Sequence, residues 1–197
     1  MTVIGITGGS GAGKSTALTV LADMGAHIFD CDTIYHELLE TSAPMLGDLD
    51  QCFPGVVVDG RLRRKALGEI VFRDPEALAA LCAITHKYVS QTLDERLALL
   101  AESGTTLVAI EAIALIESGI AARCDFTVGI LAPAADRVQR IIDREGISAA
   151  YATARIESQK PDAFFREHCD AIIENQHTSP AAFAEVCRVL FERLLGV

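Results

Sequence analysis

The sequence lacks the features that mark disordered or repetitive chains. It contains no low-complexity tract, and its six prolines and fifteen glycines are spread along 197 residues. Half of the residues are hydrophobic, so a chain of this length can bury most of the surface that its unfolded form exposes. We therefore expect a compact globular protein.

A surplus of basic residues is also missing. The chain has 17 lysines and arginines against 27 aspartates and glutamates, for a formal net charge of −10. Proteins that bind nucleic acids or anionic membranes broadly hold the phosphate groups with a surplus of Lys and Arg. We therefore expect neither partner, and any phosphate ligand must be held by a local arrangement of donors.

Neither the cysteines nor the apolar segments point to a special compartment. The six cysteines form no CxxC pair and no Cys/His cluster, which argues against a zinc or redox motif. The first apolar run has no basic segment before it and stops at Gly8, unlike a signal peptide. The most apolar window, 105–122, contains Glu111 and Glu117, which are costly in a bilayer. We expect a reduced, cytoplasmic protein without membrane spans.

Short apolar runs alternate with longer stretches of helical period, the pattern of a parallel α/β sheet. Strands are predicted at residues 3–7, 27–30, 106–111 and 126–131, with a weaker fifth at 171–174 before a final helix at 181–195. No other convincing strand lies between the second and third, where three helices are predicted at 61–72, 75–84 and 86–101. A second helical pair, 134–145 and 148–159, is joined at Gly146, a residue suited to end a helix.

These elements predict one domain over residues 1–197 with two helical additions. The core is expected at about 1–42, 104–133 and 168–197, the helical insertion at about 43–103 and a helical lid at about 134–167.

Residues 8–15 satisfy the phosphate-loop pattern GxxxxGK[ST] and stand between a predicted strand and a predicted helix, the context that the motif requires. Glycines let backbone N–H groups turn toward phosphate, and the following helix N-terminus adds positive potential. Lys14 is expected to contact the terminal phosphates, and the Ser15 hydroxyl to bind Mg²⁺. The loop alone fits kinases, GTPase switches and motor ATPases. The chain lacks the Asn-Lys-x-Asp tetrapeptide of guanine specificity, which disfavours a switch GTPase.

Three carboxylates follow predicted strands, where ligands of open α/β sheets gather. Asp30 and Asp32 end the second strand, and Asp32 is the candidate to accept or orient the proton of an attacking hydroxyl. Asp32 also precedes the predicted helix 33–40 and is suited to cap it. Glu111 ends the third strand, where an acid can hold a water ligand of Mg²⁺ or make a structural hydrogen bond.

Arginines recur on one face of the first lid helix. Arg137, Arg140 and Arg144 are spaced by three and four residues, and Arg155 follows in the next helix. Arginine matches the charge that spreads over a transferred phosphoryl group, and we favour Arg140 and Arg144 for that role. The alternative is a solvated face paired with the acidic residues of the same helix.

Together these features resemble the dephospho-coenzyme A kinase family over nearly the whole chain. In the first half the matching segments are Thr7 with the loop 8–15, Asp30-Cys31-Asp32, Gly60-x-Leu62-x-Arg64-x-x-Leu67, Val71-Phe72 and Leu81-x-x-Ile84-Thr85-His86. In the second half they are Arg140-x-x-x-Arg144, Arg155-Ile156-x-x-Gln159 and Cys169-Asp170-x-x-Ile173-x-Asn175. Their order and spacing are far more specific than a phosphate loop alone.

The resemblance implies a three-layer P-loop NTPase fold of the nucleoside-monophosphate-kinase type, with a five-stranded parallel sheet. It implies an insertion that binds the coenzyme A part of the substrate through Arg64 and His86, and Asp32 as the base for the ribose hydroxyl. Catalysis would involve Asp32, Lys14, Arg140 and Arg144, with Mg²⁺ held by Ser15 and, through water, by Glu111. The nucleotide would contact Gly9, Ser10, Gly11, Ala12, Gly13, Lys14, Ser15, Thr16, Arg155 and Asn175.

The sequence departs from the family pattern at several positions near the acceptor contacts. Lys87 follows His86 where the family usually has proline, and Ile113 stands where the family has a proline after the third strand. Phe164 and Phe165 stand about where a lysine is common, and Gln176 with His177 replaces the usual residues after Asn175.

We expect a kinase, either a monomer or a weak homo-oligomer, that transfers phosphate from ATP to the ribose 3′-hydroxyl of dephospho-coenzyme A, the last step of coenzyme A synthesis. Two alternatives remain at this stage. One is another small-molecule or nucleoside kinase of the same fold, and the other is a regulatory P-loop ATPase.

Overall fold

The computed structural model describes residues 1–176 and 179–197. Five strands form one sheet in the order β2-β5-β1-β6-β7: β1 (Thr2–Thr7), β2 (His27–Asp30), β5 (Leu107–Glu111), β6 (Phe126–Leu131) and β7 (Ala171–Glu174). The pairs β1–β5, β1–β6 and β6–β7 are parallel. The predicted α/β fold with a five-stranded sheet is confirmed. Only β1, which begins one residue earlier, and β5, which begins one residue later, differ from the predicted strands.

The chain folds as two compact units. The first comprises Met1–Phe29 and Thr105–Val197, and the second comprises Asp30–Gly104. Strand β2 therefore ends at the boundary between them, because its last residue is Asp30.

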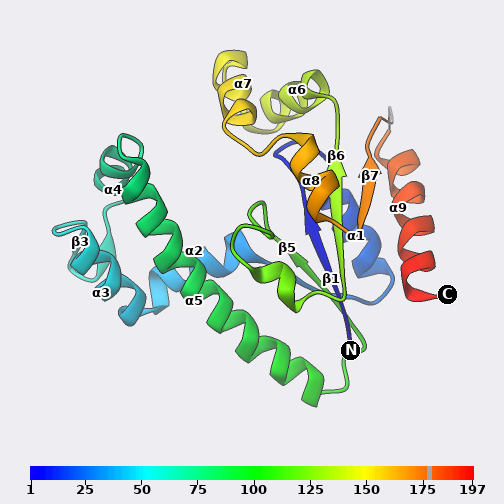
Figure 1. The fold of residues 1–197 in the computed structure, drawn as a ribbon, viewed down its shortest axis with the longest axis horizontal. Coiled ribbons are helices and arrows are strands. Elements are labelled where there is room, and N and C mark those ends of the chain that lie inside the picture. The colour runs from blue at the N-terminus through cyan, green and yellow to red at the C-terminus, as the bar shows by residue number, and fades with distance from the viewer. Residues whose placement is uncertain (177–178) are drawn as a thin grey trace. The chain divides into compact units, whose positions relative to one another are not determined.

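In the first unit, α1 (Lys14–Asp23) and α9 (Pro180–Leu195) pack side by side against one face of the sheet (Figure 1). Phe183 and Phe191 of α9 are fully buried there with Ile4 and Ile6 of β1. Successive side chains of a strand point to opposite faces, so Ile4 and Ile6 share this core while the residue between them faces away.

The opposite face of the sheet is covered by the segment after β5, which includes the 3₁₀ helix η1 (Ile120–Arg123), and by α8 (Asp162–His168). The packing is close, because a methyl group at Gly5 would lie 2.7 Å from both Leu115 Cδ2 and Cys124 Sγ. One at Gly129 would lie 3.4 Å from Phe165 Cβ. Helices and the sheet therefore form the layers expected of a P-loop fold.

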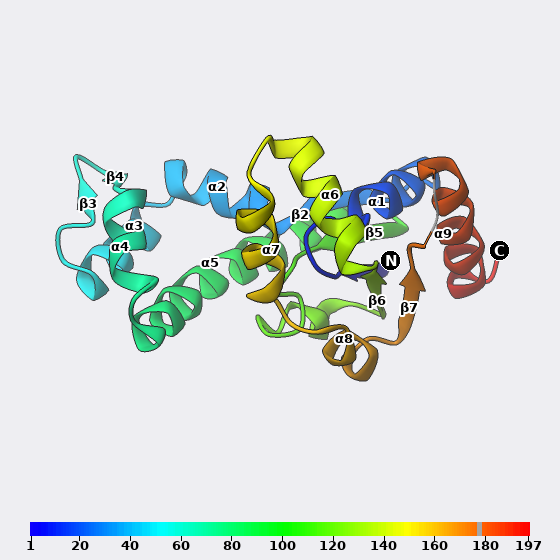
Figure 2. The same ribbon diagram turned by 90° about the horizontal axis from the view of Figure 1, so that it is seen from above.

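Two further helices of the first unit follow β6. Helix α6 (Ala134–Glu145) ends at Gly146, whose φ of 66° is readily adopted by glycine, and this confirms the predicted helix end. Helix α7 (Ala149–Glu157) begins after Ser148, whose side chain accepts a hydrogen bond from the Tyr151 N–H. The two helices lie side by side (Figures 1 and 2).

The second unit is mostly helical. It contains α2 (Cys31–Thr41), α3 (Ala43–Cys52), α4 (Arg64–Val71) and α5 (Pro75–Glu102), with a small hairpin of β3 (Val57–Val58) and β4 (Arg61–Leu62) beside α3 (Figure 2). Its core is aliphatic and aromatic, built around Met45 and Leu49 of α3, Phe53, and Leu67 and Val71 of α4. It therefore has a hydrophobic core of its own.

The hairpin corrects the prediction of a single helix over 61–72. Asp59 and Gly60 form the two-residue turn between its strands, with φ of 51° and 72°, and α4 begins only at Arg64. An Asp-Gly pair between short apolar runs is a strong hairpin signal, which the helical spacing of the following residues obscured.

Helix α5 corrects a second prediction, because residues 75–84 and 86–101 form one continuous helix. The Thr85 hydroxyl donates to the carbonyls of Leu81 and Cys82, a bond that threonine makes without leaving the helix. Short helices α3 and α8 were not predicted at all. Within residues 1–176 and 179–197, no helix combines the length and apolar character needed to cross a bilayer.

Candidate active site

The phosphate loop connects β1 to α1, as predicted. Gly13 stands before the first residue of α1 with a φ of 113°, a conformation that favours glycine, and it has no side chain to cap the helix. Gly8 has a φ of 134°, and a methyl group there would collide with the backbone oxygen of Ile130. The sequence therefore places a tight backbone turn at a helix N-terminus whose first N–H groups are available to an anion.

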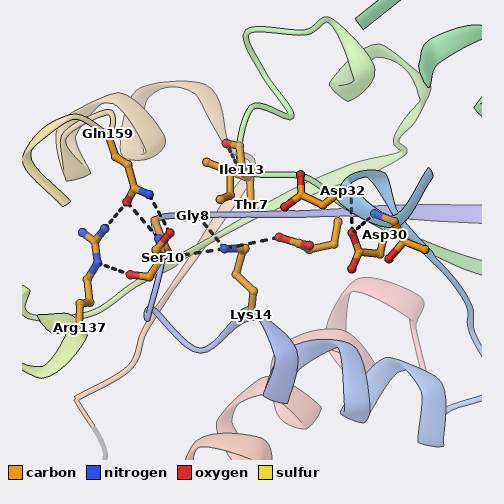
Figure 3. A network of polar contacts seen from close by, with 12 residues as sticks. Thr7, Gly8, Ser10, Lys14, Asp30, Asp32, Ile113, Arg137 and Gln159 are labelled. Carbon is orange, nitrogen blue, oxygen red and sulfur yellow. Dashed lines mark hydrogen bonds and ion pairs between the residues drawn. The ribbon is translucent and has the colours of Figure 1, made fainter. Parts of the chain in front are cut away.

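Lys14 lies against the loop that precedes it. Its Nζ donates to the carbonyl oxygens of Gly8, at 3.0 Å, and Gly9, at 3.4 Å (Figure 3). Glu111, at the end of β5, places Oε1 3.4 Å from the same Nζ, and the two side chains are 11% and 12% exposed. The ammonium group is thus held over the loop, where a bound phosphate would meet it.

Two arginines of α6 reach the loop. Arg140 Nη1 donates to the carbonyls of Gly11, at 3.1 Å, and Ala12, at 3.5 Å. Arg137 is only 6% exposed, and its Nε donates to the Ser10 carbonyl at 2.9 Å (Figure 3). Burial lowers the pKa of Arg137, but an arginine stays protonated in a protein.

Arg144 and Arg155 take other partners. Arg144 Nη2 lies 2.5 Å from Glu145 Oε1, and Arg155 Nη1 lies 2.9 and 2.8 Å from the two oxygens of the same carboxylate. Hydrogen bonds from Arg144 and then Arg155 lower the pKa of Glu145. The structure therefore brings Arg137 and Arg140 to the loop, whereas Arg144 and Arg155 form a separate ion-pair cluster.

A hollow beside the loop collects several of the predicted nucleotide contacts. Asn175, which follows β7, is 5% exposed and donates through Nδ2 to the Ala12 carbonyl at 2.8 Å. The hollow measures about 220 Å³ and is lined by Gly13, Thr16, Arg140, Asn175, Ser179, Pro180 and Phe183. Its mixed polar and aromatic lining suits a flat heterocyclic ring next to the phosphates. Gln176 turns to Glu174 instead, and His177 lies outside the described residues.

The predicted metal ligands stand at the ends of two elements. Ser15 is exposed in the first turn of α1, and Glu111 is the last residue of β5. Ile113 stands where the family pattern has proline. Its backbone carbonyl accepts a hydrogen bond of 3.0 Å from Thr7 Oγ1, which links β1 to the segment after β5 (Figure 3).

In the second unit, the structure separates the roles of Asp30 and Asp32. Asp30 is the N-cap of α2, because its Oδ1 accepts from the N–H groups of Asp32, at 2.8 Å, and Thr33, at 3.1 Å (Figure 3). The prediction that Asp32 caps a helix beginning at residue 33 is therefore wrong. The helix begins at Cys31 because the residue before it, Asp30, accepts hydrogen bonds from N–H groups of its first turn. The Asp32 carboxylate is exposed in the first turn.

Arg64 lines a hollow in the second unit. It measures about 300 Å³, and two arginines, one glutamate and two leucines line it: Leu39, Glu40, Arg61, Leu62 and Arg64. His86 is half-buried in α5. Its neighbour Lys87, a departure from the family, donates to Asp48 Oδ2 at 3.0 Å, and Tyr88 donates to the same oxygen at 2.8 Å. Both hydrogen bonds, that of Tyr88 first, lower the pKa of Asp48.

The departures at Phe164 and Phe165 have structural roles. Phe165 is 2% exposed and packs in the first unit beneath Gly129. The Phe164 ring stacks on His168 with centroids 4.4 Å apart, and the Lys160 ammonium lies 5.0 Å from its centre.

Two residues that contact the loop were not assigned to the site from sequence. The sequence favours Arg140 and Arg144 over Arg137, and it places Gln159 in a segment that matches the family without indicating a role for it. Gln159 Nε2 donates to Ser10 Oγ at 2.8 Å, and its Oε1 accepts from the Ser10 N–H at 3.0 Å. The spacing of Arg137 and Arg140 puts both on one face of α6, but spacing does not show which part of that face meets the loop.

Comparisons with known proteins agree with this geometry. The profile of the family described as dephospho-CoA kinase matches residues 2–180. The dephospho-CoA kinase of Anaeromyxobacter dehalogenans is 36% identical over 192 residues, which cover 96% of this chain and 91% of that protein. The crystal structure of TT1252 from Thermus thermophilus superposes with a TM-score of 0.81 at 35% identity, covering 100% of this chain and 97% of that one.

A second solved structure carries the description of the matching family. Dephospho-CoA kinase from Campylobacter jejuni superposes with a TM-score of 0.68 at 26% identity, and 98% of each chain is covered. The matching profile spans both units of this chain and includes the phosphate loop, α6 and β7. On the extent of that match and of the identity to its curated relatives, this chain belongs to the dephospho-CoA kinase family.

Proposed function

We propose that this protein transfers the γ-phosphoryl group of ATP to the 3′-hydroxyl of the ribose in dephospho-coenzyme A, giving coenzyme A and ADP, the final step of coenzyme A biosynthesis. The observation that carries the proposal is the phosphate loop with Lys14 and Arg140 against it, in a chain of the dephospho-CoA kinase family. The transfer is direct and in line, so no residue needs to form a covalent intermediate.

The donor half of the site lies in the first unit. Lys14 exchanges its contacts with the Gly8 and Gly9 carbonyls for oxygens of the terminal phosphates. Arg140 adds a planar pair of donors beside the loop, and Thr16 and Asn175 border the hollow proposed for adenine. The loop from Gly9 to Ser15 is proposed to offer backbone N–H groups to the phosphates, apart from those of Ser10 and Ala12, which donate to Gln159 Oε1 and to the Gly9 carbonyl.

The lid proposed at about 134–167 also contains Arg144 and Arg155. For either to reach a phosphate, it must exchange Glu145 for the ligand, since both are paired with that carboxylate. Lids of this kind close on binding, and we propose that closure makes this exchange.

Magnesium fits the oxygen donors present. The Ser15 hydroxyl is exposed at the start of α1, and the Glu111 carboxylate ends β5, next to Lys14. Mg²⁺ prefers such oxygens and usually keeps waters and phosphate oxygens in the rest of its shell. When bound, the ion neutralises charge on the β- and γ-phosphates. Ser15 would hold it directly and Glu111 through water.

The acceptor half is proposed in the second unit. Asp32 is exposed and does not cap α2, since Asp30 does so, and we propose Asp32 as the base or orienting group for the 3′-hydroxyl. The insertion at about 43–103 is proposed to hold the coenzyme A part of the substrate. Arg64 lines a hollow together with Arg61, and a guanidinium group there suits a phosphate of the substrate. His86 is the second proposed contact. We further propose that the protein acts as a cytoplasmic monomer.

The test is a steady-state assay of ADP formation with ATP, Mg²⁺ and a panel of acceptors: dephospho-coenzyme A, free nucleosides and none. We expect turnover only with dephospho-coenzyme A. Lys14→Ala should abolish it, while Arg193→Ala, which removes a cation from an exposed position of α9, should not. Turnover without an acceptor would contradict the proposal in favour of an ATPase, and turnover with nucleosides in favour of another kinase.

A further inference from the structure

Ser10 is the third residue of the phosphate loop, and its carbonyl, N–H and hydroxyl groups all form hydrogen bonds with residues outside the loop. Arg137 Nε donates to its carbonyl at 2.9 Å, and Gln159 binds both its N–H, at 3.0 Å, and its hydroxyl, at 2.8 Å. Arg137 Nη2 donates to Gln159 Oε1 at 2.6 Å and so closes the network (Figure 3). We call these three side chains, Ser10, Arg137 and Gln159, the loop clamp.

The clamp has a consequence for the next N–H group. A trans peptide is planar, so the Ser10 carbonyl and the Gly11 N–H point in opposite directions. Arg137 fixes that carbonyl toward α6, and this fixes the Gly11 N–H on the other side of the loop. Arg140 holds the Gly11 carbonyl in the same way. The clamp therefore sets the orientation of loop N–H groups before any ligand binds.

The clamp leaves no room for a side chain at Gly9. A methyl group at Gly9 would collide with the Arg137 guanidinium and lie 2.8 Å from Gln159 Oε1. Unlike Gly8, Gly11 and Gly13, Gly9 does not have a positive φ, so alanine is compatible with its backbone. Glycine is needed at this position for the space that the clamp occupies, and not for its torsion angles.

The charge of Arg137 is also unusual. It is 6% exposed, and among the described residues its hydrogen bonds go to two neutral oxygens, the Ser10 carbonyl and Gln159 Oε1. A buried cation without a carboxylate at hydrogen-bonding distance is costly to maintain. The charge of the Asp162 carboxylate offsets part of this cost, and a phosphate bound at the loop would offset more of it.

We propose that Arg137 and Gln159 are positioning residues of the phosphate loop. They act through Ser10: they hold its peptide in the orientation that presents the loop to nucleotide phosphate, and so couple α6 and the segment after α7 to nucleotide affinity. The proposal rests on the proposed function only in that the loop binds a nucleotide.

The test measures the Kd for Mg-ADP by calorimetry, which needs no acceptor. We expect Arg137→Ala and Gln159→Ala to weaken binding roughly ten- to hundred-fold, since each removes hydrogen bonds that involve a charged donor or a buried acceptor. At saturating ATP, the KM for dephospho-coenzyme A should stay within about twofold of the unchanged protein, because the acceptor is not held by the clamp. Gln139→Ala, on the exposed face of α6, and Arg166→Ala, an exposed arginine of α8, are matched controls.

Two further variants test whether Arg137 acts by positioning the loop and not merely through its charge or through the stability of the fold. Arg137→Lys keeps the charge but loses the planar fork, and we expect it to bind nearly as poorly as Arg137→Ala. Gly9→Ala should weaken binding by displacing the clamp. In the Arg137→Ala background it should therefore cost much less than it does alone.

The proposal is overturned if the clamp variants bind Mg-ADP like the controls, or if Arg137→Lys restores full affinity. It is also overturned if Gly9→Ala and Arg137→Ala act additively. If the protein bound Mg-ADP as described but did not phosphorylate dephospho-coenzyme A, the proposed acceptor would be wrong and the clamp would stand.

Discussion

The neighbouring carboxylates Asp30 and Asp32 allow catalysis and folding to be tested separately in one helix turn. Asp30 accepts two backbone hydrogen bonds, of 2.8 and 3.1 Å, as the cap of α2, whereas Asp32 is exposed one residue into the helix. We predict that Asp32→Asn destroys turnover with little loss of stability, and that Asp30→Ala does the reverse.

The magnitudes follow from the two environments. A general base contributes about 10²- to 10⁴-fold to a rate, so Asp32→Asn should lower kcat by that factor. Removing a negative charge near a helix N-terminus costs only about 0.3–1 kcal/mol of unfolding free energy. Loss of the Asp30 cap costs about 0.5–2 kcal/mol, and each kcal/mol lowers the unfolding midpoint by roughly 2–4 °C in a chain of this size.

The assay compares kcat with dephospho-coenzyme A and the thermal unfolding midpoint for both variants. Asp74→Ala serves as a control, because Asp74 caps α5 through two similar bonds, of 2.9 and 3.3 Å, and has no proposed role in the reaction. The reasoning would be refuted by near-normal kcat in Asp32→Asn. It would also be refuted if the two Asp variants lost activity equally and in proportion to stability.

Two other predictions concern the scaffold. Hydrogen bonds from the Thr127 side chain and backbone lower the pKa of the Asp170 carboxyl below its usual value of 3.8. The ionised carboxylate therefore stabilises the fold fully above about pH 4, and this stabilisation is lost as the pH falls through the folded-state pKa. Thr127→Val should therefore destabilise the protein more at pH 7 than at about pH 3 in urea unfolding, and an equal effect at both would contradict this. Burial raises the pKa of Cys124 and of Cys187 to about 12, so a thiol reagent at about pH 8 should label exposed Cys52 first, and Cys52→Ser should remove the fast phase.

The sheet was well predicted because its signals are local. Each strand is a short β-branched apolar run with a clear end, and the phosphate loop is recognisable from eight consecutive residues. The same local character explains the success at Gly146, where a glycine ends α6. No long-range contact is needed to read any of these features.

The helical insertion was predicted less well because the same residues carry signals for both a turn and a helix. The helical spacing after Gly60 hid the Asp-Gly turn of the β3–β4 hairpin. The two helices predicted at 75–84 and 86–101 left out Thr85, which lies inside one continuous helix. The cap of α2 was placed two residues late because Asp30 and Asp32 are equally good capping residues by type. Only the backbone path from β2 into α2 decides between them.

The site residues likewise fall into those that local sequence identifies and those that only the folded structure places. The amino-acid sequence by itself determined that Lys14 and Ser15 belong to a phosphate loop and that Glu111 ends a strand, because both features are local. That this strand, β5, pairs with β1 was decided by the fold. Which arginines meet the loop was decided only by tertiary structure, since helical spacing does not show which part of a helix face meets the loop. The packing of α6 turns Arg137 and Arg140 to the loop and leaves Arg144 and Arg155 with Glu145. The role of Gly9 likewise depends on a guanidinium 128 positions away in the chain, which only the folded structure places beside it.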